Sequence, residues 1–209
     1  MSFAYLEQVF LGNERGPISW LIRALLWPLS VIYRAGLAVY LWLYRIGVRK
    51  RCKLGVPVIS VGNLTCGGTG KTPAVQAICR LLQDQGKSVV ILSRGHGGSV
   101  KGATVASDGN TILATSAEVG DEPILLANTL PDVPVIVGKD RRQSGKLAIE
   151  QFNPDVIVLD DGLQYWQLHR DLDIVILNAR KPFGSGCVFP MGDLREPKSG
   201  LRRGGLVLL

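Results

Sequence analysis

The chain is 209 residues long, which suits one α/β domain with an additional segment and is enough to bury a sizeable core. Its 24 Lys and Arg exceed its 17 Asp and Glu, giving a formal net charge of +7. Residues 1–55 hold 8 basic and 2 acidic residues (net +6), whereas residues 56–209 hold 16 and 15 (net +1), so a nucleic-acid-binding face on the larger part is not expected. The four cysteines lack the spacing of a zinc site, and reduced thiols are expected.

Residues 1–55 are predicted to be a hydrophobic and basic membrane-associating segment. The 21 residues between Arg23 and Arg45 are interrupted only by Pro28 and Arg34, and roughly 20 apolar residues span a bilayer. A helix lying in the interface would spare Arg34 a cost of about 2.5–3.5 kcal/mol at the membrane centre, so spanning and lying flat both remain open. Five positive charges in residues 45–53 would bind anionic lipid and hold this end on the cytoplasmic side. A buried helical hairpin with a basic linker is the alternative.

Residues 56–209 are predicted to form the main domain. Apolar runs that suit parallel strands covered on both faces are Val56–Val61, Ser88–Leu92, Val133–Val137, Val156–Leu159, Leu172–Leu177 and Gly205–Leu209. Helices are predicted over Lys71–Gln85, Glu122–Thr129 and Arg141–Phe152. This alternation predicts an α/β, doubly wound and mostly parallel sheet of the P-loop NTPase type, with ligands at the carboxyl ends of the strands.

Residues 62–73, GNLTCGGTGKTP, lie between the first predicted strand and the first predicted helix. That is the context of a phosphate-binding loop, in which glycines let the backbone approach a polyphosphate and the helix start attracts its charge. Lys71 would reach the β and γ phosphates, and Thr72 would place its hydroxyl on a magnesium ion. The usual spacing would put a glycine where this chain has Thr65. The residues expected to surround the nucleotide phosphates are Gly67, Gly68, Thr69, Gly70, Lys71 and Thr72.

The second signal is PDVIVLDDG at residues 154–162, where an apolar strand ends in Asp160 and Asp161. A P-loop protein presents its magnesium-holding carboxylate at such a place. Because adjacent side chains of an extended backbone point to opposite sides, different roles are expected for the two aspartates. A solvated turn at a strand end is the alternative reading.

Three further loops carry charged residues. In GDEP, residues 120–123, Asp121 and Glu122 are either charges at a helix start or, near a nucleotide, groups that take a proton from an attacking hydroxyl. Arg94 in SRGHGG could approach an anion, and Arg195 in PMGDLREP could neutralise a transferring phosphoryl group, with Glu196 beside it. Each arginine is equally well explained as a surface residue.

The motifs VGNLTCGGTGKTP, SRGHGG, GDEP, DDGLQYWQLHRDLDIVILNA and PMGDLREP, after a hydrophobic basic N-terminus, together resemble the tetraacyldisaccharide 4'-kinases of lipid A biosynthesis in Gram-negative bacteria. The resemblance covers essentially the whole chain and includes a threonine in the loop like Thr65. His96 and Tyr165 depart from it, because the family usually has tyrosine and histidine at these positions.

The resemblance implies transfer of the γ-phosphate of ATP, with Mg²⁺, to the 4'-hydroxyl of an acylated glucosamine disaccharide 1-phosphate, giving lipid IVA. It implies a cytoplasmic face of the bacterial inner membrane as the location and no obligatory protein partner. It assigns Lys71 and Thr72 to phosphates and metal, Asp160 and Asp161 to magnesium, and Asp121 to the acceptor hydroxyl as base. Less directly, it assigns Asn63 and Thr65 to the nucleotide, Arg195 to the reacting phosphate or the lipid headgroup, and Arg94, Glu122 and Glu196 to the substrate.

Family members are longer than this chain, which ends in the apolar run GLVLL. We therefore expect a C-terminal lobe of the family to be absent and the activity of the 209 residues to be reduced or lost. Two alternatives remain: a membrane-recruited P-loop ATPase that acts as a switch or positioning protein, and a nucleotide-binding remnant without transfer activity. The sequence does not give the acyl-chain preference or the oligomeric state.

Overall fold

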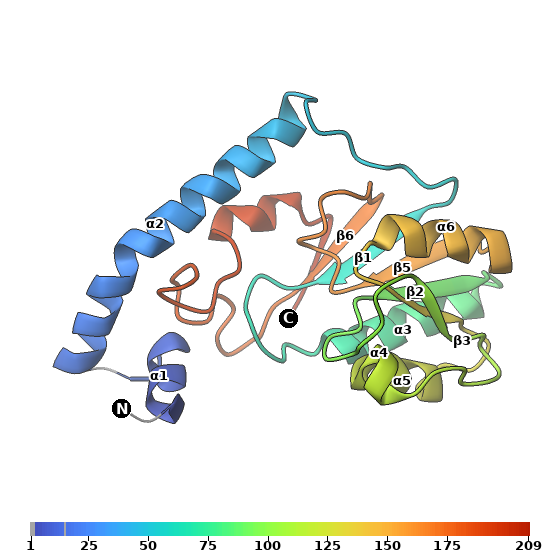
Figure 1. Ribbon diagram of the computed structural model, residues 1–209, viewed down its shortest axis with the longest axis horizontal. Coiled ribbons are helices and arrows are strands. Elements are labelled where there is room, and N and C mark those ends of the chain that lie inside the picture. The colour runs from blue at the N-terminus through green and yellow to red at the C-terminus, as the bar shows by residue number, and fades with distance from the viewer. Residues whose placement is uncertain (1–2, 15) are drawn as a thin grey trace. The chain divides into compact units, whose positions relative to one another are not determined.

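The computed structural model describes residues 3–14 and 16–209 (Figure 1). The chain divides into two compact units, each assembled from segments that are distant in the sequence. The first unit comprises Met1–Lys50, Asn63–Thr69 and Val175–Leu209, and the second comprises Arg51–Gly62 and Gly70–Ile174. The glycine-rich loop therefore belongs to the first unit up to Thr69 and to the second from Gly70 onward.

The second unit is organised around a mostly parallel sheet. Its strands are β1 (Val58–Gly62), β2 (Val89–Ser93), β3 (Thr104–Ser107), β4 (Val135–Val137), β5 (Val156–Asp160) and the beginning of β6 (Leu172–Ile176). β5 pairs in parallel with β1 and β2, β2 pairs in parallel with β4, and β3 pairs antiparallel with β4. The strand order is β3-β4-β2-β5-β1-β6-β7, and this order confirms the predicted fold class.

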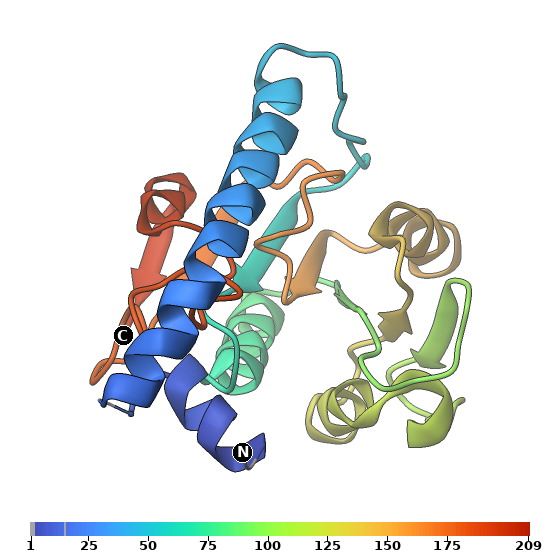
Figure 2. The same cartoon turned by 60° about the vertical axis from the view of Figure 1, so that its left-hand side comes forward.

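Helices cover both faces of this sheet, as Figures 1 and 2 show. Three lie on one face, namely α3 (Lys71–Asp84), the short α4 (Ser116–Val119) and α5 (Asp121–Thr129). α6 (Arg141–Phe152) lies on the other face. All five residues of β2 and of β5 are buried, because central parallel strands have a helix layer on each side.

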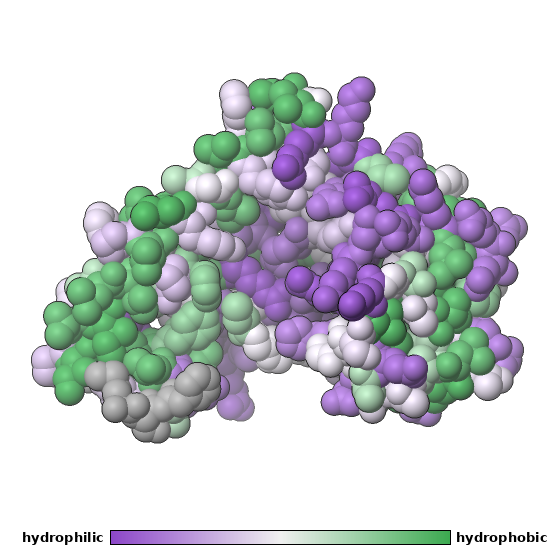
Figure 3. All heavy atoms as spheres, in the orientation of Figure 1, coloured by the Kyte–Doolittle hydropathy of each residue, from purple (hydrophilic) through white to green (hydrophobic). Residues whose placement is uncertain are grey.

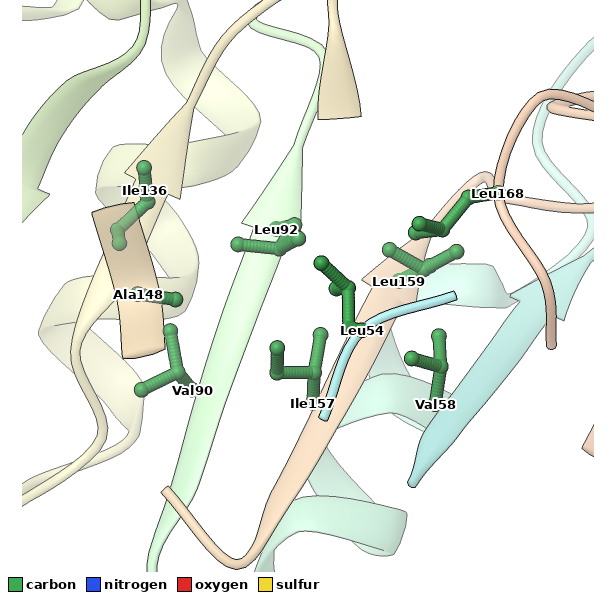
Figure 4. Close-up of a cluster of buried hydrophobic side chains, with 9 residues drawn as sticks. All are labelled: Leu54, Val58, Val90, Leu92, Ile136, Ala148, Ile157, Leu159 and Leu168. Atoms are coloured by element: carbon green, nitrogen blue, oxygen red, sulfur yellow. The ribbon is translucent and has the colours of Figure 1, made fainter. Parts of the chain in front are cut away.

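The core between the sheet and α6 is made of alternate strand residues. Ile157 and Leu159 of β5 point into it, as do Val90 and Leu92 of β2 (Figure 4). Leu54, which precedes β1, completes this core and fills the space that a Cβ at Gly145 of α6 would need. Glycine at that helix position therefore permits close packing of the chain before β1.

The start and end of α6 are fixed by local chemistry. Asp140 is its N-cap, and the Asp140 carboxylate accepts a hydrogen bond from the N–H of Arg142 at 3.0 Å. Asn153 ends the helix in the left-handed conformation, with φ of 43°. The predicted range of this helix agrees with the observed one because both boundary signals are local.

The first unit contains two N-terminal helices, α1 (Phe3–Phe10) and α2 (Pro17–Arg45), together with the short 3₁₀ helix η1 (Lys198–Arg203), β7 (Leu206–Leu208) and the end of β6. α1 lies beside the beginning of α2 in both ribbon views (Figures 1 and 2), and Arg23 of α2 donates to the carbonyl of Val9 at 2.9 Å. The loop after β6 also packs on α2. Ser30 donates to the carbonyl of Val188 at 2.8 Å, and the ring of Phe189 meets that of Tyr33 with centroids 5.6 Å apart.

α2 is one continuous helix of 29 residues, and Pro28 does not end it. It is long and apolar enough to cross a membrane, and only 6% of its most apolar window is buried. Figure 3 shows apolar side chains gathered over it. Large apolar side chains that are more than half exposed on α2 are Ile18, Trp20, Leu21, Leu25, Trp27, Leu29, Ile32, Val39 and Trp42. The alternative of a buried hairpin is therefore not what the structure has.

Candidate active site

The glycine-rich loop leads from β1 to α3 and requires glycine at two positions. Gly67 has φ of 105° and Gly70, the N-cap of α3, has φ of 80°, a region in which a Cβ is strained. Among the described residues, nothing lies within 4 Å of a Cβ placed at Gly67, Gly68 or Gly70. The backbone on this side of the loop is therefore open to close approach by a ligand.

The beginning of α3 presents N–H groups and a basic side chain. Within the described part of the chain no side chain caps this helix, so its first N–H groups and the positive end of its dipole can attract an anion. Lys71 and Thr72 are its first two residues, and both are partly buried. Thr69, just before them, has a buried hydroxyl without a hydrogen-bond partner among the described residues.

The first half of the loop, in the first unit, is held by the segment around Arg195. Thr65 forms an antiparallel bridge with Leu194, and the N–H of Arg195 donates to the carbonyl of Leu64 at 2.8 Å. The N–H of Cys66 donates to the carbonyl of Asp193 at 2.7 Å. Thr65 occupies the place of the usual glycine. It pairs with Leu194 as a strand residue would, and this pairing does not require glycine.

Asn63, Arg195 and Glu196 complete this part of the first unit. Asn63 is fully buried, and its amide donates to the Thr65 hydroxyl at 3.5 Å. The Arg195 side chain is partly exposed, and its carbonyl accepts from the Tyr33 hydroxyl at 2.7 Å. Glu196 is 1% exposed and forms an ion pair with Arg203, so its carboxylate already has a partner within the fold.

Asp160 and Asp161 lie at the carboxyl end of β5 and differ in backbone conformation. Asp160 is the last residue of the strand, whereas Asp161 takes the left-handed conformation with φ of 52°. Asp161 Oδ1 lies 3.8 Å from Lys71 Nζ. The turn is tight, because a Cβ at Gly162 would come within 2.6 Å of Leu159 Cβ. The different roles expected for the two aspartates remain a prediction, and Asp161 is not part of the extended backbone from which that prediction was argued.

The environment of Asp160 raises the pKa of this carboxyl from 3.8 to about 6. The largest cause is burial, since only 4% of the residue is exposed, and the negative charges of Glu122 and Asp161 add to it. A hydrogen bond from the Ser93 hydroxyl at 2.9 Å and the charge of Lys71 act in the opposite direction. Asp160 is therefore an acid whose ionised form is costly until a cation is nearby.

The GDEP and SRGHGG loops pack backbone to backbone. A Cβ at Gly95 would meet the carbonyl oxygen of Val119, one at Gly98 that of Glu118, and one at Gly120 that of His96. Asp121 and Glu122 are exposed in the first turn of α5, and the charge of Glu122 acts on Asp160. Arg94 is exposed at the end of β2. The glycines of SRGHGG thus support the turn that carries Asp121.

Arg141, the first residue of α6, is a candidate that sequence reasoning missed. Only 3% of it is exposed, and among the described residues its Nε has no hydrogen-bond partner. Burial and the charge of Arg94 lower the pKa of its guanidinium, while the charges of Asp161 and Asp160 raise it. A buried cation with an unused donor, on which the charges of a second arginine and two carboxylates act, suits a bound anion such as a phosphate. The signal in the sequence is an arginine at a helix start, where the helix dipole disfavours it.

The residues present suit a magnesium ion that is held jointly by the protein and the nucleotide phosphates, not one that is enclosed by protein side chains alone. Within residues 3–14 and 16–209 no group of three or more His, Cys, Asp or Glu side chains could hold a metal ion. Asp160, Asp161 and the hydroxyl of Thr72 offer hard oxygen atoms, and magnesium usually completes such a set with phosphate oxygens and water.

Comparison with known proteins assigns the chain to a family. The family model for LpxK, tetraacyldisaccharide-1-P 4'-kinase, matches residues 22–209. The tetraacyldisaccharide 4'-kinase of Geobacter metallireducens is 48% identical over 90% of this chain, and that of Geobacter sulfurreducens is 45% identical over 94%. The chain belongs to the tetraacyldisaccharide 4'-kinase family. The resemblance that the motifs indicated is thereby confirmed.

A solved structure of a tetraacyldisaccharide 4'-kinase supports the same fold. The structure of LpxK from Aquifex aeolicus, described as an "apo" form in complex with ATP, is 42% identical, has a TM-score of 0.83 and covers 89% of this chain. This chain corresponds to 58% of that protein and to 56% of each Geobacter relative. It therefore spans little more than half the length of the curated relatives that it matches.

Proposed function

We propose that this chain transfers the γ-phosphate of ATP to the 4'-hydroxyl of a tetraacylated glucosamine disaccharide 1-phosphate, the step that forms lipid IVA in lipid A biosynthesis. The observation that carries the proposal is the grouping of Lys71, Asp160 and Asp161 at the start of α3 and the end of β5. A lysine at a helix start beside strand-end carboxylates is the arrangement that P-loop kinases use for phosphoryl transfer. The relatives' name supplies the acceptor.

Each candidate site residue of the second unit has a role in this proposal. The N–H groups at the start of α3 and the ammonium of Lys71 bind the β and γ phosphates. Asp160, Asp161 and the Thr72 hydroxyl hold magnesium, which neutralises charge on the phosphates when it is bound. Burial of Asp160 favours this role, because a divalent cation offsets the cost of its ionised form.

Asp121 is assigned the role of the base that takes the proton from the acceptor hydroxyl. The Asp121 carboxylate is exposed at the first turn of α5, where it can accept a proton from a substrate hydroxyl. Arg94 and Glu122 are proposed to contact the substrate from the same unit. In the first unit, Asn63 and Thr65 are assigned to the nucleotide and Arg195 to the reacting phosphate or the lipid headgroup. Glu196 is assigned to the substrate, and its carboxylate also pairs with Arg203.

Membrane association is proposed for residues 1–55, with residues 56–209 as the kinase core. The exposed apolar side chains of α2 would enter the bilayer boundary, and the basic residues after it would bind anionic lipid. A membrane-bound acceptor requires the enzyme at that surface, and ATP is supplied from the cytoplasm, so the cytoplasmic face of the bacterial inner membrane is the proposed location.

The test is a mixed-micelle assay with γ-labelled ATP, Mg²⁺ and the tetraacylated disaccharide 1-phosphate, with label followed into the lipid. The unsubstituted chain should label the lipid, and Lys71→Ala should abolish labelling because the phosphates lose their cation. Asp121→Ala should keep ATP binding and lose transfer. Binding of ATP is measured in parallel on the same preparations by calorimetry.

Two results would contradict the proposal. Lipid labelling that persists in Lys71→Ala would exclude this site as the source of transfer. ATP binding without lipid labelling by the unsubstituted chain would indicate that the residues present bind nucleotide but do not complete the reaction.

A further inference from the structure

Tyr165 connects the turn that carries the two aspartates with the start of α6. Its N–H donates to the carbonyl of Gly162 at 2.9 Å, directly after Asp160 and Asp161. Its carbonyl accepts from Arg170 at 2.6 Å, and Arg170 is held in turn by an ion pair of 2.7 Å with Asp173. The backbone of Tyr165 is therefore fixed relative to the turn.

The side chain of Tyr165 is fixed at its hydroxyl. This hydroxyl donates to Asp140 Oδ1 at 2.8 Å and accepts from the N–H of Arg141 at 3.1 Å. It thereby uses both its donor and an acceptor position on the two residues with which α6 begins. Asp140 is itself anchored by Arg142, whose guanidinium donates to both carboxylate oxygens, at 2.9 and 2.7 Å.

The ring of Tyr165 lies against the guanidinium of Arg141. Arg141 Cζ is 5.3 Å from the ring centroid, within the range of a cation–π contact. The guanidinium also donates a long hydrogen bond, of 3.5 Å, to the carbonyl of Lys139. The ring and the fixed start of α6 are thus the main restraints on a buried cation on which the charges of Asp160 and Asp161 act.

We propose that Tyr165 is a positioning residue, which holds the Arg141 guanidinium toward the carboxylates of Asp160 and Asp161 so that its unused N–H can bind a phosphate of the nucleotide. This inference rests on the proposed function. Tyr165 contacts no phosphate itself in this arrangement. It acts by joining the carboxylate turn to α6, so that the cation and the carboxylates keep a constant separation when the nucleotide binds.

The experiment measures the dissociation constant of Mg²⁺–ATP by calorimetry on the purified chain, which requires no lipid acceptor. Arg141→Gln removes the cation and should weaken binding about ten-fold or more, as expected for a charge-assisted hydrogen bond. Tyr165→Phe keeps the ring but removes the hydroxyl, and should weaken binding about three- to ten-fold. Tyr5→Phe, which removes the same atom from α1, is the matched control and should bind as the unsubstituted chain does.

The double variant separates positioning from a merely structural role. If Tyr165 acts through Arg141, Tyr165→Phe should add no further loss in the Arg141→Gln background. Asp140→Ser, which keeps an N-cap but removes the carboxylate to which Tyr165 donates, should weaken binding as Tyr165→Phe does. Thermal unfolding of each variant is recorded, and a lower Tm with an unchanged dissociation constant would assign Tyr165 to stability alone and overturn the proposal.

Three further outcomes would also count against the positioning role of Tyr165. Losses from Tyr165→Phe and Arg141→Gln that multiply in the double variant would exclude action through Arg141. Unchanged binding in both Tyr165→Phe and Asp140→Ser would exclude the hydroxyl link. Absence of ATP binding by the unsubstituted chain would overturn the proposed function, and this inference with it, whereas normal binding without lipid labelling would leave the measurement valid.

Discussion

Asp160 has the most unusual electrostatic environment among the residues of the candidate site. Its carboxyl is 4% exposed and lies near two other acidic groups, and the pKa is raised from 3.8 to about 6. At neutral pH the folded chain therefore carries a buried negative charge that the unfolded chain would solvate. Asp160, which we propose as a magnesium ligand, thus reduces the stability of the folded chain before magnesium is bound.

Asp160→Asn should stabilise the fold while it abolishes lipid phosphorylation. In the unsubstituted chain, the folded state binds the proton of the Asp160 carboxyl more tightly than the unfolded state does. The stability that this protonation gives the unsubstituted chain is fully present below pH 3.8 and is lost as the pH rises through about 6. At pH 7.5 the variant should therefore unfold with a free energy about 1–3 kcal/mol higher than the unsubstituted chain, and near pH 4 with little difference. Urea denaturation at the two pH values measures both quantities.

Asp155→Asn is the matched control for that experiment. The Asp155 carboxylate is fully exposed, and hydrogen bonds from the N–H and hydroxyl of Ser88 lower its pKa. This group favours the folded state when it is ionised, so its replacement should not stabilise the chain at pH 7.5. A stabilising effect of equal size in both variants, or a destabilising effect of Asp160→Asn, would contradict the burial argument.

The residues of the candidate site were predictable from sequence to different degrees. Lys71 and Asp160 belong to motifs that lie next to strongly apolar strands, so both their chemistry and their place in the sheet could be predicted. Arg141 belongs to no such motif, and Tyr165 lies in one but departs from the residue that the family usually has there. They meet because the turn after β5 and the start of α6 approach in the fold, and the contact between these two residues is not local in the sequence.

At the scale of elements, α2 is set apart from the other helices by its exposed apolar side chains. Leu25 on α2 is 69% exposed, in a helix whose most apolar window is 6% buried. The Arg23 side chain binds the carbonyl of Val9 at 2.9 Å, so one of the charges of this stretch has a partner in α1. A helix of this composition gains free energy by placing its apolar side chains in lipid.

Leu25→Glu should weaken binding to lipid vesicles, because a charged side chain would replace an apolar one at the lipid boundary. The matched control is Leu81→Glu on α3, since Leu81 is 58% exposed and the substitution is chemically the same. Vesicle co-sedimentation should decrease several-fold for Leu25→Glu and remain unchanged for Leu81→Glu, with ATP binding equal in both. Equal sedimentation of the two variants would contradict a lipid-facing role of α2.

The elements of the sheet were largely predictable, and the exceptions have physical reasons. All six predicted strands are present, with boundaries displaced by at most two residues. For β1, β2, β4 and β5 the reason is that continuous apolar runs identify buried parallel strands, whereas β7 is exposed along its length. β3 was not predicted. Its sequence, TVAS, is short and only partly apolar, and it is a strand because it pairs antiparallel with β4. α4 was not predicted either, because its four residues are too few to give a periodic pattern.

At the scale of the whole molecule, the charge is distributed unevenly along the chain. Residues 1–55 contribute +6 of the net +7, and five of these positive charges lie in residues 45–53, directly after the apolar part of α2. Lys50 and Lys53 are both exposed, so they can meet a lipid surface. A basic residue near an anionic membrane contributes about 1 kcal/mol at physiological salt.

Binding to vesicles that contain anionic lipid should therefore decrease as salt increases. Raising the salt to about 0.5 M shortens the screening length well below the roughly 10 Å of 0.1 M, while binding to neutral vesicles should change little. Lys50→Gln with Lys53→Gln should reduce the salt dependence, and Lys87→Gln, an exposed lysine of the second unit, should not. Co-sedimentation across a salt series measures this, and a salt-independent profile would exclude an electrostatic contribution.

The pairing of the glycine-rich loop with a distant part of the chain has a consequence for folding during synthesis. Residues 64–66 are hydrogen-bonded to residues 193–195, which a ribosome makes only after residues 70–174 of the second unit. Contacts between such distant residues form late, because the intervening chain must be closed into a loop first. A nascent chain that has completed β1, α3 and β5 therefore still lacks the ordered first half of its nucleotide loop. Affinity for ATP should consequently appear only after residues 193–195 have been made and have paired with the loop.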